Sequence, residues 1–232
     1  MRYCALLLAV LLFFAPTAAD AQNTQDLEVG FKAGGALSTF HGNTGAITRG
    51  GSLDYQRREG FHAGAFVSIP LNAALSVRPG LTYVQKGASV DDTRAFGVDS
   101  SPPIDVQESY EFSYLQLPLL LEARLPTGRS FQSYLVLGPS VGVNVQKNIE
   151  RNEDVQTEAI PESEVNPLEV GFIGGFEFGY EVRDLGTVTL GANYDLGLNQ
   201  IIPDDEAAAE KGKEAEFRNG ALTLSLGYRF SL

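Results

Sequence analysis

The last stretch of the chain, residues 221–232 with the sequence ALTLSLGYRFSL, alternates between apolar and polar side chains. From Leu222 onward every second residue is apolar, with Thr, Ser, Gly and Arg between them. Because successive side chains of a β-strand point to opposite faces, the stretch predicts a strand with one apolar and one polar face. In a water-soluble protein the apolar face needs a core that covers it.

The rest of the chain repeats this alternation and offers almost no helix that could cover a sheet. The other alternating stretches are residues 27–38, 60–69, 74–86, 110–123, 131–145, 168–182 and 187–198. An apolar face that protein does not cover can be covered by lipid, and the sheet must then close, since an open edge leaves backbone groups unpaired in hydrocarbon. The sequence therefore predicts an all-β fold, an eight-stranded antiparallel up-and-down transmembrane β-barrel.

The connections between these stretches alternate in length. The short ones, rich in Pro, Gly, Asn and Asp, are residues 70–73, 124–130 and 183–186; the long ones are residues 39–59, 87–109, 146–167 and 199–216. This layout is typical of a barrel with short periplasmic turns and long extracellular loops. The alternative is a soluble lipid-binding barrel, which would turn its apolar face inward.

The first residues have the features of a secretory signal peptide. Arg2 precedes an apolar run over residues 5–15, which is too short to span a bilayer, and Ala19-Asp20-Ala21 forms an A-x-A cleavage site. We expect residues 1–21 to be cleaved and residues 22–232 to form the barrel domain in the bacterial outer membrane; the alternative is a retained anchor. Cys4 is the only cysteine, so the mature chain would have none.

The polar faces of the strands predict the contents of the barrel interior. An eight-stranded barrel is wide enough only for its own side chains, and buried charges must be paired. The expected lumen charges are Lys32, Arg78, Lys86, Glu122, Glu177, Glu181, Asp195 and Arg229, joined by Gln116, Asn144 and Asn193. The favoured interpretation is a salt-bridged plug, and the alternatives are an ion path or a catalytic carboxylate pair.

The sequence gives no motif for catalysis, a metal or a cofactor. The histidines are His41 in the first long loop and His62 on the second strand; His62 is predicted inward near Ser68, but no motif joins them. The Gly-rich run over residues 171–179 lies in a strand and not before a helix, so it is not a phosphate-binding loop. We therefore expect no enzyme, no cofactor and no metal site. A formal charge of −12 argues against nucleic acid.

Three of the predicted loops are acidic. The segments 88–108, 146–166 and 199–216 each carry a net charge of −4. Solubility is the simpler reason for this charge, and bridging by divalent cations or contact with a partner is the alternative. Residues 206–217 have helix-forming composition and could add a short helix to the last loop.

Short motifs in order along the chain resemble the PorT-like outer-membrane β-barrel family of Bacteroidetes-type bacteria, within the porin-family outer membrane protein β-barrel domains. The motifs are GFKAGGALSTF (30–40), YVQKGAS (83–89), YLQLPLLLEA (114–123), LVLGPSVGVNV (135–145), GFIGGFEFGYE (171–181), YDLGLNQI (194–201) and RNGALTLSLGYRF (218–230). Family members usually end near Tyr-x-Phe, whereas this chain adds Ser231 and Leu232. The resemblance implies the barrel fold and no catalytic residues, and one member of the family takes part in protein secretion.

These observations predict a non-enzymatic outer-membrane barrel with a filled lumen and a structural or interaction role at the cell surface, with an association with secretion as one candidate role. The alternatives are an outer-membrane lipid-modifying enzyme and a small porin-like channel. The expected partners are outer-membrane lipid, the barrel assembly machinery through the C-terminal strand, and an envelope protein.

Overall fold

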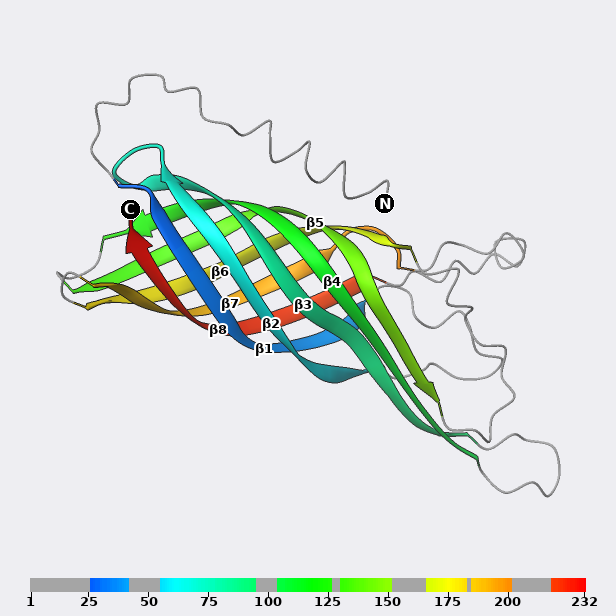
Figure 1. Cartoon of the computed structure of the whole chain (residues 1–232). Helices are drawn as coiled ribbons and strands as arrows, with labels where there is room; N and C mark the ends of the chain where they lie inside the picture. The colour runs from blue at the N-terminus through cyan, green and yellow to red at the C-terminus, as the bar shows by residue number, and fades with distance from the viewer. Residues whose placement is uncertain are drawn as a thin grey trace.

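The computed structural model describes residues 26–41, 55–94, 104–126, 130–151, 166–182, 185–201 and 218–232. These contain the strands β1 (Glu28–His41), β2 (Tyr55–Pro70), β3 (Leu75–Arg94), β4 (Ile104–Leu125), β5 (Phe131–Arg151), β6 (Leu168–Val182), β7 (Gly186–Gly197) and β8 (Arg218–Ser231). Each strand pairs antiparallel with its neighbours in chain order, and β1 pairs with β8 (Figure 1). The predicted fold class, a closed eight-stranded antiparallel barrel, is confirmed.

Closure brings the two ends of the barrel sequence together. The pairing of β1 with β8 runs from Glu28 opposite Ser231 to His41 opposite Arg218. The start of β1 and the end of β8 therefore lie at the same barrel end as the β2–β3, β4–β5 and β6–β7 connections. We call this the short-turn end, which the usual layout of such barrels places in the periplasm. In the β2–β3 turn, the side chain of Asn72 accepts hydrogen bonds from the backbone N–H groups of Ala74 and Leu75.

Five strands extend further toward the opposite end than the sequence predicts. Residues expected in long loops belong to β1, β2, β3, β4 and β5 instead, and the β3–β4 ladder continues to Arg94 opposite Ile104. Figure 1 shows this hairpin and β5 projecting beyond the other strands. The loop boundaries at 39, 59, 87, 109 and 146 were therefore wrong. Strand that projects past the bilayer has no lipid to face, so its side chains need not alternate.

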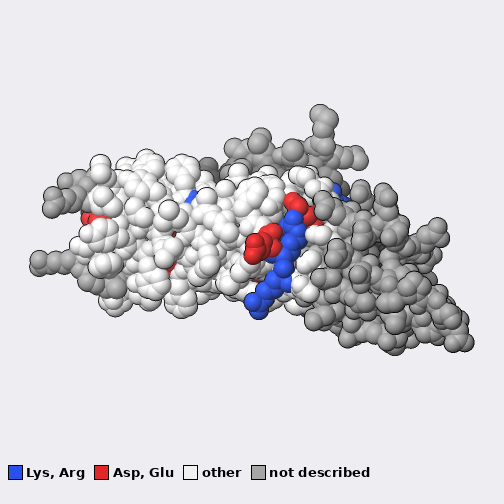
Figure 2. All heavy atoms as spheres, turned by 90° about the horizontal axis from the view of Figure 1, so that it is seen from below, with Lys and Arg blue, Asp and Glu red and all other residues white. Residues whose placement is uncertain are grey.

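The outer surface of the barrel is apolar. Large outward-facing side chains on every strand are exposed, for example Phe31 at 54%, Leu190 at 62% and Leu226 at 64%. Figure 2 shows a broad uncharged surface over the barrel, with Lys, Arg, Asp and Glu side chains gathered mainly toward one end on that face. Such an apolar surface is stable in contact with lipid but not in contact with water.

Aromatic side chains on the outer surface form pairs near the short-turn end. Phe31 stacks on Phe230 with ring centroids 6.5 Å apart, and Phe131 lies 5.3 Å from Tyr180. The hydroxyl of Tyr228 donates to the Leu185 carbonyl at 2.6 Å. Aromatic residues with one apolar and one polar side favour the membrane–water boundary, as in the girdles of outer-membrane barrels.

Within the described ranges, no helix is long and apolar enough to cross a membrane. The predicted signal peptide and the predicted helix over residues 206–217 lie outside the described residues, as do many of the acidic loop side chains.

Candidate functional site in the barrel lumen

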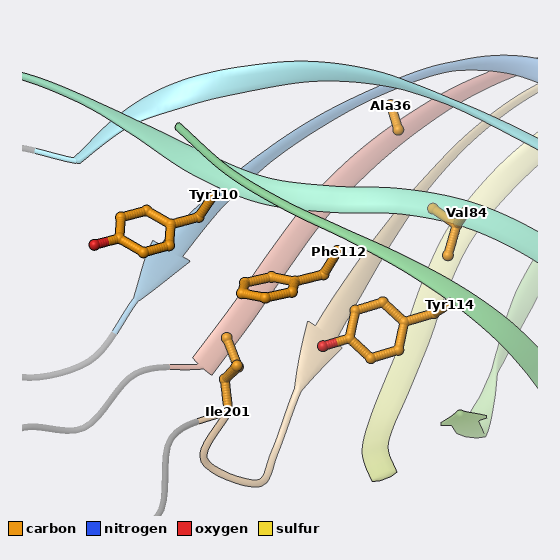
Figure 3. Close-up of a cluster of buried hydrophobic side chains, with 6 residues drawn as sticks. All are labelled: Ala36, Val84, Tyr110, Phe112, Tyr114 and Ile201. Atoms are coloured by element: carbon orange, nitrogen blue, oxygen red, sulfur yellow. The ribbon is translucent and has the colours of Figure 1, made fainter. Parts of the chain in front are cut away.

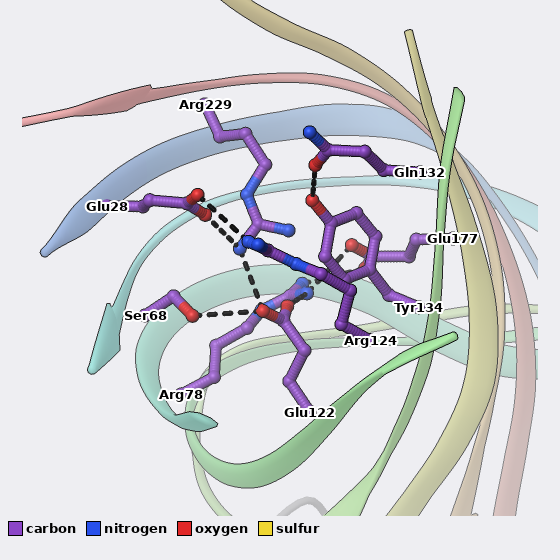
Figure 4. Close-up of polar contacts among 9 residues, drawn as sticks. All are labelled: Glu28, Ser68, Arg78, Glu122, Arg124, Gln132, Tyr134, Glu177 and Arg229. Atoms are coloured by element: carbon purple, nitrogen blue, oxygen red, sulfur yellow. Dashed lines mark hydrogen bonds and ion pairs between the residues drawn. The ribbon is translucent and has the colours of Figure 1, made fainter. Parts of the chain in front are cut away.

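The first of two charged groups in the interior lies toward the short-turn end, and we call it the lower cluster: Glu28, Arg78, Glu122, Glu177 and Arg229 (Figure 4). The guanidinium of Arg78 binds Glu177 through two parallel hydrogen bonds of 2.7 Å, and its Nη1 also donates to Glu122 at 2.9 Å. The side chain of Arg78 is 1% exposed. A bidentate pair of this kind fixes both orientation and distance, so it ties β3 to β6 across the lumen.

Arg229 completes the lower cluster from β8. Its Nη2 lies 2.9 Å from Glu122 Oε1 and 2.8 Å from Glu28 Oε2, and its guanidinium lies 4.4 Å from the centroid of the Tyr134 ring. Ser68 donates a hydrogen bond of 2.9 Å to the same Glu122 oxygen. Glu122 thus accepts from two arginines and a serine, and a buried carboxylate is stable only when it has such partners.

The second charged group lies further from the short-turn end, and we call it the upper triad: Lys86, Glu169 and Asp195. The Lys86 ammonium pairs with Glu169 and lies 2.6 Å from Asp195 Oδ2. Gln116 donates to both carboxylates, at 3.2 and 2.9 Å, and Asn219 donates to Glu169. These side chains come from β3, β4, β6, β7 and β8, so the triad also crosses the lumen.

Two apolar clusters fill other parts of the interior. One contains Ala36, Val84, Tyr110, Phe112, Tyr114 and Ile201, with Phe40 packed against it (Figure 3). The other consists of Leu120, Val136 and Ile173, at most 9% exposed. The interior is therefore partly apolar, whereas the alternation in the sequence predicted only polar side chains and glycines over most of it.

Seven of the eight predicted lumen charges project into the interior. Six of them belong to the lower cluster or the upper triad, and Lys32 lies near Arg78, Glu177 and Asp195. Glu181 is the exception: its side chain is exposed, because it lies one residue before the end of β6 where the barrel opens. The prediction that places Glu181 in the lumen is corrected accordingly.

Two charged lumen residues were missed by the sequence reasoning. Glu169 and Glu28 both lie near the start of a predicted strand, and neither was counted among the lumen charges. The alternation of side chains along each strand would have assigned both residues to the lumen. Within the lower cluster, Arg78 holds Glu177, and Arg229 binds Glu122 and Glu28.

The residues considered for catalysis do not form a reactive group. His62 and Ser68 are both buried on the inner face of β2, but the Ser68 hydroxyl donates to Glu122 and makes no hydrogen bond to His62. Among the described residues, no group of three or more His, Cys, Asp or Glu side chains gathers that could hold a metal ion.

A closed barrel with an apolar exterior and a charge-paired interior defines a transmembrane β-barrel protein. The chain belongs to the family described as outer membrane protein beta-barrel domain, which matches residues 19–203. It is accordingly an outer-membrane barrel protein of a bacterium.

Solved structures with this fold are similar to the chain at low sequence identity. Ail of Yersinia pestis, solved with the heparin analogue sucrose octasulfate, is 14% identical with a TM-score of 0.41, covering 89% of this chain and 100% of Ail. OprG of Pseudomonas aeruginosa is 13% identical with a TM-score of 0.49, covering 92% and 100%. Neisserial surface protein A is 13% identical with a TM-score of 0.43, covering 89% and 97%. No curated protein sequence matches the chain.

Proposed function

We propose that this protein is a non-enzymatic integral outer-membrane barrel with a closed lumen and a structural or interaction role at the cell surface. The observation that carries the proposal is the filling of the interior. Two ion-paired groups cross the lumen at different heights, and the cluster of Leu120, Val136 and Ile173 occupies further space. A channel needs a continuous aqueous path, and a lumen filled by its own side chains provides none.

The test is conductance of the refolded protein in planar lipid bilayers. The proposal predicts no stable open level, while heat-modifiable migration of the same preparation on gels shows that the barrel is folded. Steady channels that admit sugars would refute the closed lumen and favour the porin-like alternative.

The enzyme alternative has a separate test. The Ser68 hydroxyl donates a hydrogen bond to Glu122, so in this proposal it holds lumen side chains together and does not act as a nucleophile. The folded protein should not hydrolyse or transfer acyl chains of phospholipid or lipopolysaccharide. A turnover that Ser68→Ala or His62→Ala abolishes, while the heat-modifiable form remains, would overturn the non-enzymatic assignment.

The proposal extends to export and to partners. Residues 1–21 are cleaved on export, the C-terminal strand engages the barrel assembly machinery, and the extracellular end contacts an envelope protein in the manner of a PorT-like, secretion-associated barrel. Support comes from the A-x-A site, from the apolar period of β8, and from the projecting β3–β4 hairpin. Crosslinking in intact outer membranes followed by capture of the barrel tests the partner. Recovery of the barrel with lipid but without a crosslinked protein would refute the proposed contact with an envelope protein.

A further inference from the structure

The apolar cluster drawn in Figure 3 lies at the end of the lumen opposite the short turns. We call it the mouth cluster: Ala36, Val84, Tyr110, Phe112, Tyr114 and Ile201, each at most 7% exposed. Phe40 of β1 packs on it, with its ring centroid 6.1 Å from that of Tyr110 and 6.3 Å from that of Phe112. Apolar side chains from β1, β3 and β4 therefore meet at the extracellular end of the barrel.

Tyr114 connects the mouth cluster to the upper triad. Its hydroxyl accepts a hydrogen bond of 3.2 Å from Asn219, which also donates to Glu169, and the Lys86 ammonium lies 5.6 Å from the centroid of its ring. The next buried residue along β4 on the same face is Gln116, which donates to both carboxylates of the triad. The mouth cluster therefore lies directly over the triad and separates it from the extracellular end.

Ile201 is the member of the mouth cluster that lies outside the strands. It comes after the end of β7 at Gly197, and it is 4% exposed. Figure 3 shows its side chain directed from this connection toward Phe112. A side chain on a connection can leave an apolar cluster without breaking the ladder of the barrel wall, whereas the other five members cannot.

Hydrogen bonds hold this connection against the start of β6. The side-chain amide of Asn199 accepts from the backbone N–H of Val170 at 2.7 Å and donates to the carbonyl of Leu168 at 2.8 Å. The backbone N–H of Asn166 donates to the Ile201 carbonyl at 2.7 Å. Asn199 thus binds two backbone groups of β6 with one side chain, and this places Ile201 over the lumen.

We propose that Ile201 is a stopper for the extracellular mouth of the barrel, held in place by Asn199, and that its release exposes the upper triad. The inference rests on the closed lumen of the proposed function and locates the outer barrier. Ile201 contributes nothing to the lower cluster, whose ion pairs cross the lumen nearer the short-turn end. Release of the stopper therefore opens the upper lumen without forming a channel.

The test is the labelling of a single cysteine at position 221 by a membrane-impermeant maleimide, with the barrel folded in lipid nanodiscs. Ala221 is fully buried and lies opposite Asp195 in the β7–β8 ladder, so the probe reports access to the triad. Ala221→Cys alone should label slowly. Adding Ile201→Asp should make labelling fast, because a carboxylate is not stable in an apolar cluster. Ile201→Val, which stays apolar, should keep the slow rate.

The role of Asn199 is tested on the same probe. Asn199→Ala removes both hydrogen bonds to β6 and should raise the labelling rate about fivefold, because the open state gains population. Leu198→Ala is the matched control, since this side chain is exposed on the outer surface and its backbone hydrogen bond to Val170 remains. Heat-modifiable migration shows that each variant is folded, and none of them should conduct in planar bilayers.

The outcomes separate the stopper from the closed lumen. Slow labelling of both Ile201→Asp and Asn199→Ala would refute the stopper and leave the closed lumen intact. Fast labelling of Ala221→Cys without a second substitution would refute both. Equal effects of Asn199→Ala and Leu198→Ala would refute the role of Asn199. Steady conductance of the Ile201→Asp barrel would refute the claim that only the upper lumen opens.

Discussion

Removal of the Arg229 guanidinium should destabilise the barrel more than removal of any charge at the rim. Arg229→Met keeps the length and apolar stem of the side chain but takes a partner from Glu122 and from Glu28. Breaking a buried ion pair on one side costs about 3–5 kcal/mol. Arg78 still holds the other oxygen of Glu122, and the Glu28 side chain is 20% exposed, so we expect the lower end, about 3 kcal/mol.

The assay is urea titration of the barrel folded into lipid vesicles, with unfolding followed by migration on gels and by circular dichroism. Arg124→Met is the matched control, because Arg124 is 42% exposed and its pair with Glu28 should contribute about 0–1 kcal/mol. Adding Glu122→Gln to Arg229→Met should restore part of the loss, and lower pH should do the same by protonating the carboxylates that have lost Arg229. Equal costs for Arg229→Met and Arg124→Met would refute the claim that the buried ion pairs of the lower cluster stabilise the barrel more than the exposed pair at the rim.

Three further predictions concern the wall of the barrel and export. Leu224→Arg, in the middle of the lipid-facing side of β8, should cost about 2–4 kcal/mol, and Leu232→Arg beyond the end of the strand about 0–1 kcal/mol; equal costs in the same titration would contradict the membrane position. Gly34→Ala should lower the stability because the new Cβ atom would run into the β8 backbone. Gly35→Ala should be tolerated, because nothing lies within 4 Å of its Cβ position; a larger loss of stability for Gly35→Ala than for Gly34→Ala would show that the two faces of β1 are assigned the wrong way round. Mass spectrometry of the protein from outer membranes should give a chain that begins at Gln22, and recovery of the intact precursor would refute cleavage.

The fold could be predicted from the sequence because lipid imposes a pattern on every strand that crosses it. Alternation locates eight strands, and the parity of Phe31, Leu190 and Leu224 assigns the outer face. The same reasoning failed at the far end of β3 and β4, where the ladder continues to Arg94 opposite Ile104 through residues without a sustained alternation of apolar and polar side chains.

The candidate site could be predicted as a set of residues but not as a set of contacts. Parity assigns a charge to the lumen without saying which strands lie opposite each other, since this depends on the tilt and stagger of the barrel. Arg78 rather than Arg229 reaches Glu177 for this reason. The cluster of Leu120, Val136 and Ile173 was missed because an apolar residue next to lipid-facing leucines or phenylalanines looks the same in sequence whichever way it points.

The most direct measurement of the central claim is spin-label scanning of β8 in lipid vesicles. The mature chain is expected to have no cysteine, so single cysteines can be placed at each position from 221 to 228 without background. Accessibility to dissolved oxygen, which concentrates in the bilayer, should alternate with a period of two and be highest at 222, 224, 226 and 228, whose side chains are exposed on the outer surface. Oxygen accessibility that peaks at the odd positions, or that shows no alternation, would contradict a barrel that faces lipid with its apolar side.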